Sequence, residues 1–415
     1  MLRRCLLSAA VVSMLLVAIP PASAHGLGWV RQFGSADIDW AYSVAYTGNA
    51  VYAVGETRGH LPGKTSNGDF DAFLVKFDTA GTLMWTRQFG TDAADSAYGV
   101  AADATGIYVA GETLGPVPGG TKRRTGEAYL RKFTPSGATA WTVQFGTNKE
   151  DAATRVAVGP DGITVAGATL GTFGNQHRHG EWDAFVAQFD TLGHRHWLRQ
   201  FGSQGTDVAY GVATDVNGAV VSGFAAGRLP GQTYKSGRDA FVVAFAPDGS
   251  RRWTHEFGTS NLDQARAVAV HGGITYVVGD TGGTLPGQQL RGFGDAFVRA
   301  YAVDGAGLWT HQFGTLDYDA GTGVAVDATG LYVLGSTWGV FKHQTDRGRV
   351  DAFVRAFDLN GTGRWTHQFG SNGTEEPSDC VTDGGGTVYA IGSTSGRMRG
   401  ETNLGYDDAF VAQIS

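Results

Sequence analysis

A six-residue pattern recurs seven times along this chain of 415 residues. Each copy reads Trp-x-x-Gln/Glu-Phe-Gly, and 56 residues separate each tryptophan from the next. These tryptophans are Trp29, Trp85, Trp141, Trp197, Trp253, Trp309 and Trp365. A fixed period of this length indicates a fold built from copies of one unit, in which each copy relies on its neighbours to cover its hydrophobic faces.

One repeat contains four short segments that are typical of β-strands. In the repeat that ends at Gly370 they are residues 323–327, 331–335, 351–358 and 364–369. Asn360 and Gly361 join the last two segments, and both residue types tolerate the positive φ that tight turns require. In the last segment the large aromatic residues fall on one face, as the two-residue period of a strand demands. Each repeat therefore predicts a four-stranded antiparallel unit.

Seven such units, without any helical pattern, predict an all-β fold: a seven-bladed β-propeller of four-stranded blades. We expect the first strand of each blade to be innermost. Residues 28–33 form a fourth strand that has no partners before it, and residues 408–414 form a third strand that has no fourth strand after it. The N-terminal strand should therefore complete the last blade, which closes the ring and covers an open sheet edge.

Residues 1–24 have the features of a secretory signal peptide. Two arginines precede an apolar run over residues 5–19, and a small-x-small motif ends at Ala24. We expect cleavage after Ala24, a propeller of residues 25–415, and a secreted or periplasmic location. The apolar run is too short to span a membrane comfortably, and no later stretch is apolar enough to do so.

The repeats also resemble the bacterial SBBP β-propeller repeat. The resemblance rests on an aspartate followed by Val-Ala, then a Tyr-Ala-Val-Gly-Glu-Thr strand, then an Asp-Ala-Phe strand, as in Asp39–Ala45, Tyr52–Thr57 and Asp71–Asp78. It covers nearly the whole of residues 25–415. The second blade departs from it at residues 127–129, and the last blade departs at residues 375–377 and contains one inserted residue. The resemblance implies a propeller and export, and it implies no catalytic residues.

Charge and cysteine content exclude two classes of protein. The chain has 32 Lys and Arg against 39 Asp and Glu, and loss of Arg3 and Arg4 on cleavage leaves a net charge of −9. A general nucleic-acid binder needs cationic contacts to phosphate, so we expect no nucleic-acid partner. Only Cys380 remains after cleavage, so there is no disulfide framework, and stability must come from the core. We expect a monomer.

Loop length distinguishes the two faces of the predicted ring. The loops between the second and third strands are long and differ among blades, and they emerge on the same face as the loops that join one blade to the next. We call this face the top face. The loops of the opposite face are short, uniform turns. Binding residues usually lie on variable loops held by a rigid scaffold, so we expect the function to reside on the top face.

Three tryptophans lie outside the repeat position, and all three are predicted in top-face loops. Trp40 is expected between two blades, and Trp182 and Trp338 are expected between second and third strands. Exposed aromatic residues can anchor ligands or partners, but local packing of each ring over its own blade is the favoured alternative. The binding residues expected near the axis are Trp40, Trp182, Trp338, Tyr234 and Phe341, with His177, Lys342 and Arg347 as polar contacts.

Two sets of acidic residues are also predicted on the top face. One set follows each repeat tryptophan by ten residues: Asp39, Asp95, Asp151, Asp207, Asp263, Asp319 and Glu375. The other set begins each third strand: Asp71, Glu127, Asp183, Asp239, Asp295, Asp351 and Asp408. Clustered carboxylates can bind Ca²⁺, so calcium is the one cofactor that these acids suggest. A structural role is favoured, because turns need the same acid in every blade and a single metal site does not.

The sequence leaves the function open among three hypotheses, because a fold does not determine a function. The leading one is an exported, non-enzymatic binding or scaffold module for an envelope glycan, another envelope component or a protein. The second is an extracytoplasmic hydrolase or lyase that uses top-face carboxylates, with or without a divalent cation. The third is a rigid structural disk. One or two strongly raised carboxyl pKa values in an axial pocket would favour an enzyme, and seven similar low values would favour binding. No residue is assigned a catalytic role.

Overall fold

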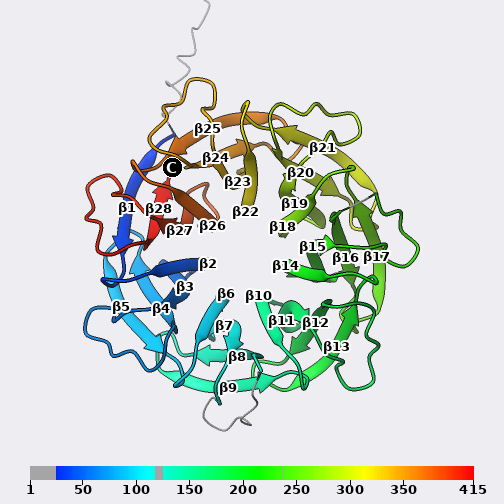
Figure 1. The fold of residues 1–415 in the computed structure, drawn as a ribbon, viewed down its shortest axis with the longest axis horizontal. Coiled ribbons are helices and arrows are strands. Elements are labelled where there is room, and N and C mark those ends of the chain that lie inside the picture. Colours follow the sequence, from blue (N-terminus) through cyan, green and yellow to red (C-terminus); the bar gives the residue numbers. More distant parts are fainter. Residues whose placement is uncertain (1–24, 117–124, 236) are drawn as a thin grey trace, which may run out of the picture.

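The structure is a computed structural model that describes residues 25–116, 125–235 and 237–415. It is a ring of seven four-stranded antiparallel β-sheets, the blades, and the described residues contain no α-helix. Figure 1 shows the blades following one another in sequence order around a central axis. The predicted seven-bladed β-propeller is confirmed. The expected signal peptide, residues 1–24, lies outside the described residues.

The first strand of each blade lies nearest the axis, and the fourth strand lies at the rim (Figure 1). The first strands are β2 (Asp39–Thr47), β6 (Asp95–Asp103), β10 (Asp151–Gly159), β14 (Asp207–Asp215), β18 (Asp263–His271), β22 (Asp319–Asp327) and β26 (Glu375–Thr382). The second strands are β3 (Ala50–Thr57), β7 (Gly106–Thr113), β11 (Gly162–Thr169), β15 (Gly218–Ala225), β19 (Ile274–Thr281), β23 (Gly330–Thr337) and β27 (Val388–Thr394).

The outer half of each blade is equally regular. The third strands are β4 (Asp71–Asp78), β8 (Glu127–Phe133), β12 (Asp183–Phe189), β16 (Asp239–Phe245), β20 (Asp295–Tyr301), β24 (Asp351–Phe357) and β28 (Asp408–Ile414). The fourth strands are β5 (Leu83–Phe89), β9 (Thr139–Phe145), β13 (Arg195–Phe201), β17 (Arg251–Phe257), β21 (Gly307–Phe313), β25 (Gly363–Phe369) and, from the N-terminus, β1 (Leu27–Phe33).

The N-terminal strand completes the last blade, as predicted. The strand order in this sheet is β1-β28-β27-β26, and β1 pairs antiparallel with β28, with Phe33 opposite Ala409. The backbone N–H of Gly26 donates to the carbonyl of Ser415 at 3.0 Å, which extends the ladder. In Figure 1 the two strands lie side by side, in blue and red. This pairing covers the edge that β28 would otherwise expose.

Aromatic side chains fill the space between neighbouring blades. Phe201 of β13 packs against Phe241 and Phe245 of the next blade, with ring centroids 5.7 and 5.6 Å apart. Phe33 of β1 makes the equivalent edge-on contact with Phe73 of the first blade, at 5.8 Å. Burial of one such ring contributes about 1.5–3 kcal/mol to folding. Phe33 and Phe201 therefore belong to the core that joins two blades.

Repeat tryptophans form a second link between blades. The indole N–H of Trp29 donates to the carbonyl of Thr79 at 3.1 Å, and that of Trp197 donates to the carbonyl of Pro247 at 2.8 Å. Both acceptors lie in the turn between the third and fourth strands of the next blade. The indole of Trp29 covers Gly81, where a Cβ would lie 2.8 Å from the ring and where φ is +80°. Glycine therefore permits both the turn and the close approach of the ring.

The innermost strands are longer than the sequence predicted. The first strand of the sixth blade was expected over residues 323–327, whereas β22 begins at Asp319, which pairs with Thr337. The prediction missed residues 319–322 because Asp319, Gly321 and Thr322 do not continue the apolar pattern that marks a strand. The acidic residue ten places after each repeat tryptophan therefore begins a strand and does not lie in a loop.

Candidate functional site

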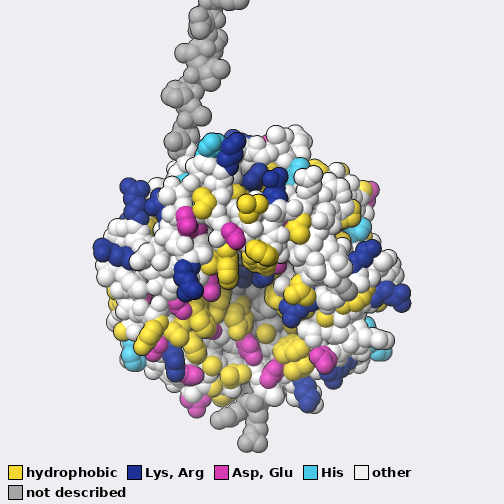
Figure 2. All heavy atoms as spheres, turned by 45° about the horizontal axis from the view of Figure 1, so that its top comes forward, with side chains coloured by type: hydrophobic (Ala, Val, Ile, Leu, Met, Phe, Trp, Pro, Cys, Tyr) yellow, Lys and Arg dark blue, Asp and Glu magenta, His cyan; other side chains and the backbone are white. Residues whose placement is uncertain are grey.

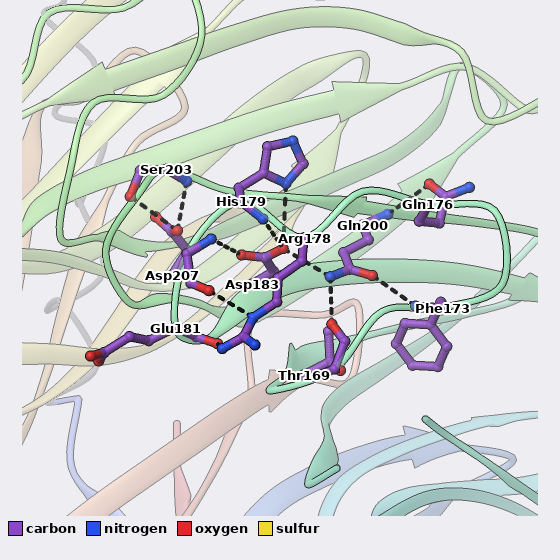
Figure 3. A network of polar contacts seen from close by, with 12 residues as sticks. Thr169, Phe173, Gln176, Arg178, His179, Glu181, Asp183, Gln200, Ser203 and Asp207 are labelled. Carbon is purple, nitrogen blue, oxygen red and sulfur yellow. Dashed lines mark hydrogen bonds and ion pairs between the residues drawn. The ribbon is translucent and has the colours of Figure 1, made fainter. Parts of the chain in front are cut away.

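Buried carboxylates hold the loops of the top face in place. Asp183, at the start of β12, accepts hydrogen bonds from the backbone N–H of His179 and from Gln200 Nε2, each at 2.8 Å (Figure 3). Asp207, at the start of β14, accepts from the backbone N–H of Ser203 at 2.6 Å and from its hydroxyl at 3.0 Å. Both carboxylates are fully buried. Their hydrogen bonds fix the turns that precede the two strands.

The same arrangement recurs around the ring. The residue four places earlier donates its backbone N–H to Asp39, Asp95, Asp151, Asp207, Asp263 and Asp319, and Ser371 donates its hydroxyl to Glu375. A loop N–H likewise donates to Asp71, Asp183, Asp239, Asp295, Asp351 and Asp408. Within the described ranges, no three His, Cys, Asp or Glu side chains are grouped so that they could hold a metal ion.

Burial raises the pKa of the carboxyls that begin the innermost strands. The pKa rises to about 6 for Asp39 and Asp319 and to about 7 for Asp207, because loss of water outweighs the hydrogen bonds that favour the ionised form. The same cause raises the pKa of Asp95, Asp263 and Glu375. The binding hypothesis expected low pKa values at these positions, and the values found are raised. That expectation did not take the deep burial of the carboxyls into account.

A β-bulge interrupts every innermost strand at one repeat position, thirteen residues after the tryptophan. In β2, Ala41 pairs with Gly55 and Ser43 pairs with Val54, so Tyr42 has no residue opposite it. Such a bulge changes the direction of the extra side chain. The seven bulge residues are Tyr42, Tyr98, Thr154, Tyr210, Arg266, Thr322 and Ser378.

All seven bulge residues line one cavity at the centre of the ring, which we call the axial cavity. Its volume is about 520 Å³, and Glu112, Ala152, Arg155, Glu376 and Pro377 complete its wall. The space-filling view shows that the centre of the molecule is hollowed and that hydrophobic side chains gather around the hollow (Figure 2). Ligand pockets typically enclose about 300–1,000 Å³, so the axial cavity is of a suitable size for a small ligand.

Hydrogen bonds hold several polar groups of this wall. Tyr42 Oη donates to Glu56 Oε1 at 2.9 Å, and the hydroxyl of Ser96 donates to the other oxygen of the same carboxylate. Arg266 Nε donates to Asp280 at 2.5 Å. Burial is the largest single influence and lowers the pKa of this guanidinium, but the Asp280 carboxylate, together with Tyr318 and Tyr210, raises the pKa overall. Arg266 therefore contributes a fixed, compensated charge.

Glu112 is different, because its carboxylate, which lies against Gly126, makes no hydrogen bond to any described residue although the side chain lines the axial cavity. Burial raises its pKa to about 7, and the Glu150 carboxylate adds to the shift. The charged and titratable groups around it are Glu56, Tyr98, Glu150, Asp151 and Arg155. A carboxyl that is half ionised near neutral pH can donate or accept a hydrogen bond, or exchange a proton, with a bound molecule.

Trp40 is not in a loop, so that expectation was wrong. It is the second residue of β2, opposite Glu56, and its half-buried ring stacks on Phe70 of the same blade with centroids 5.9 Å apart. The error has the same origin as the shortened strands, since the start of β2 was read as a loop. Trp182 is also half-buried, while Trp338 is 64% exposed. These tryptophans come from the first, third and sixth blades, and within the described part of the chain no ring contact joins them.

Phe341 was expected on the surface and is instead buried, with 6% of its surface exposed. Its ring packs edge-on to Phe353 at 4.9 Å, and its backbone N–H donates to Gln368 at 3.0 Å. The long loop folds back here so that this apolar side chain caps the core between the blades. Phe341 therefore stabilises the loop and is not available to a partner.

The other expected contacts lie on separate loops of the top face. Tyr234 is half-buried and donates its hydroxyl to the carbonyl of Gly237 at 2.8 Å. His177, Lys342 and Arg347 are exposed. Arg347 lines a different hollow of about 580 Å³, together with Arg397 and Arg399. None of the eight residues expected to bind a ligand lines the axial cavity.

The residues of the axial cavity were missed because they lie in strands and not in loops. The sequence contains only a partial signal. The position thirteen residues after the tryptophan holds Tyr, Thr, Arg or Ser according to the blade, but the residues eleven and fourteen places after the tryptophan vary at least as much. Variation alone therefore does not single out the cavity residues, and the register of the innermost strands is also needed.

No known family model matches the chain. Among curated proteins it is similar to Regulatory protein FlaEY of Caulobacter vibrioides, with 24% identity over 422 residues. The match covers 90% of this chain but only 38% of that protein, so the chain spans well under half of its relative's length. Among solved structures it is similar to the WD40 beta propeller domain of Doa1, with a TM-score of 0.51 and 10% identity over 94% of this chain and 96% of the other. That likeness shows the propeller fold alone.

Proposed function

We propose that this protein is an exported, non-enzymatic binding module that takes its ligand at the axial cavity. The observation that carries the proposal is the set of seven bulge residues, which come one from each blade, differ in chemistry and all line a single central cavity. A rigid ring that presents varied side chains toward one central hollow is suited to recognition. The loops of the top face, with exposed Trp338, would form the rim of this binding surface.

Export is supported by the sequence of residues 1–24, and membership of the SBBP-type repeat proteins is supported by the repeat pattern. We further propose a monomer that acts outside the cytoplasm, with an envelope glycan or protein as its partner. Among the described residues, no helix is both long and apolar enough to cross a membrane. FlaEY is described as a regulatory protein, and a binding role is compatible with that description.

Thermal melting in the presence of envelope fractions tests the binding proposal. A ligand that binds only the native state raises the melting temperature, by an amount set by its concentration relative to its Kd. We expect at least one fraction to raise the melting temperature of the native protein and to have no such effect on a Tyr98→Ala, Tyr210→Ala double variant. Equal shifts in both proteins would place binding outside the axial cavity, and no shift with any fraction would count against a binding module.

A second candidate function, hydrolysis or elimination, is favoured by one observation. Glu112 lines the axial cavity with a pKa of about 7, which is the range that general acid–base catalysis requires. Glu56, the carboxyl at the same repeat position in the first blade, is engaged by Tyr42 and Ser96. The enzyme hypothesis predicts turnover of chromogenic glycosides or esters that Glu112→Gln abolishes. Absence of turnover on such a panel, together with saturable binding, would select the binding module.

A further inference from the structure

We propose that the axial cavity binds an uncharged, hydroxyl-rich ligand of mono- to disaccharide size, held by hydrogen bonds to Glu112 and by contact with the cavity tyrosines. The inference rests on the proposed binding function and names the class of its ligand. It also assigns Glu112 a role as an anchoring residue.

The wall contains charged groups of both signs, which favours an uncharged ligand over a strongly charged one. Glu112 and Glu376 contribute carboxylates to the wall of the cavity, and Arg155 and Arg266 contribute guanidinium groups. Asp280 already compensates Arg266, so Glu112, Glu376 and Arg155 are the charges left for a ligand, and an ion of either sign would meet at least one group of its own sign. A hydroxyl group both donates and accepts hydrogen bonds, so a molecule rich in hydroxyls can satisfy both kinds of group at once.

The aromatic residues provide the apolar part of the contact. Tyr42 and Tyr98 lie next to each other with ring centroids 5.3 Å apart, and Tyr210 contributes a third phenol from another blade. Each is half-buried, so part of each ring faces the cavity. Burial raises the pKa of Tyr98 to about 12, so its phenol remains protonated at neutral pH. Tyrosine offers an apolar face and a polar tip, which complements the C–H faces and hydroxyl edges of a sugar ring.

Glu112 provides the directional contact. The neighbouring acid of the same repeat position, Glu56, already accepts two hydrogen bonds, whereas Glu112 accepts none from the described residues. A ligand hydroxyl that donates to the ionised carboxylate would make a charge-assisted hydrogen bond, which is stronger than a neutral one. Binding should therefore favour the ionised form of Glu112 and lower its pKa.

A second hollow on the top face gives the competing location. Arg347, Arg397 and Arg399 line it beside one carboxylate, Asp346, and the excess of positive charge would suit an acidic saccharide. Binding of an acidic ligand in this arginine hollow can be distinguished from binding of a neutral ligand in the axial cavity. Substitution of the arginines would abolish the first, and substitution of Glu112 or Tyr98 would abolish the second.

Calorimetric titration of the purified protein tests the inference. The probes are neutral disaccharides (maltose, cellobiose and N,N′-diacetylchitobiose), the acidic digalacturonate and the amine-bearing chitobiose. We expect a neutral disaccharide to bind, and Glu112→Gln and Tyr98→Ala to weaken it about tenfold or more, the size of a lost hydrogen bond to a charged group. Ser336→Ala, at the repeat position of Glu112 but outside the cavity wall, should leave the affinity unchanged. Circular dichroism melting verifies that each variant is folded.

The pH dependence provides a readout that a purely structural role of Glu112 would not give. The affinity of the native protein should be higher at pH 8 than at pH 6, because ionisation of Glu112 strengthens its acceptor, and Glu112→Gln should remove this difference. Neutral-sugar binding that survives both cavity substitutions would overturn the inference. So would binding of digalacturonate alone with loss in Arg347→Ala, although the binding function would stand. If no saccharide binds while an envelope fraction still raises the melting temperature, the ligand class is wrong; if nothing binds, both proposals fail.

Discussion

The junctions between blades and the wall of the axial cavity use their repeat positions in opposite ways. At the junctions the same acid, glutamine, phenylalanine and glycine recur in nearly every blade, and the acids accept hydrogen bonds from the backbone of adjacent loops and from the glutamine. At the bulge position of the innermost strands the side chain changes from blade to blade, and all seven side chains face one cavity. The recurring residues therefore serve the scaffold, and the convergence of seven unlike side chains on one cavity indicates where recognition can occur.

Ring closure should have the largest effect, because every junction depends on the integrity of the others. Deletion of residues 25–34 removes β1, which buries Val30 in the core and leaves β28 without its neighbour. We expect a loss of roughly 5 kcal/mol or more in the free energy of unfolding, from the burial of several large side chains. Urea unfolding followed by circular dichroism measures this loss. Melting identical to that of residues 25–415 would show that closure by β1 is not needed.

The next largest effect should separate a junction side chain from a surface side chain of similar size. Phe201→Ala should cost roughly 3–5 kcal/mol, because the ring is 3% exposed and the variant leaves a cavity between two blades. Trp338→Ala should change stability by less than about 0.5 kcal/mol, since 64% of that side chain is exposed. Chemical denaturation of both variants provides the comparison. Equal losses would mean that Trp338 belongs to the core and not to the rim of the binding surface.

Glu256 breaks the uniformity of the junctions, because the other six blades have glutamine at this position. It accepts the backbone N–H of Leu229 at 2.9 Å; burial, together with the neighbouring Asp239 carboxylate, raises its pKa to about 7. A raised folded-state pKa means that its stabilising contribution is present below about pH 4.5 and is lost as the pH rises through about 7. Glu256→Gln should therefore stabilise the protein by about 2 kcal/mol at pH 8 and much less at pH 5.

Melting curves at the two pH values measure this gain. The reverse substitution in the neighbouring junction, Gln200→Glu, serves as the matched control and should destabilise the protein more at pH 8 than at pH 5. A gain from Glu256→Gln that is the same at both pH values would contradict the assignment of the shift to the buried carboxyl.

A smaller effect is expected where one junction lacks a hydroxyl. Thr281 donates its hydroxyl to Asp263, whereas Ala225 holds the equivalent position beside Asp207, whose Oδ1 has no hydrogen-bond partner. Ala225→Thr should add about 1 kcal/mol of stability by supplying the missing donor. Thr281→Ala should remove a similar amount. If Ala225→Thr destabilises the protein in a denaturation measurement, the buried site cannot accept the larger side chain.

The two regions also differ in how far the sequence predicts them. The period of the tryptophans determines the number of blades, and the unpaired segment around Trp29 determines the closure, because both follow from strand pairing alone. The cavity could not be derived in this way. The bulge at Tyr42 depends on a register shift between β2 and β3, and Phe341 turns inward because its loop folds over the core. Local propensity does not determine where either side chain points. For this reason the sequence pointed to aromatic residues in loops, and not to residues in strands, as the binding residues.

Thermal melting of the protein with calcium, with EDTA and with neutral disaccharides tests the central claim most directly, since it compares the ring of acids with the axial cavity in one measurement. We predict that calcium and EDTA leave the melting temperature unchanged, because the junction carboxylates hold turns. We also predict that a neutral disaccharide raises the melting temperature and that Glu112→Gln abolishes this rise. A rise with calcium that EDTA reverses, with no effect of any saccharide, would contradict it and would make the repeated acids the binding site.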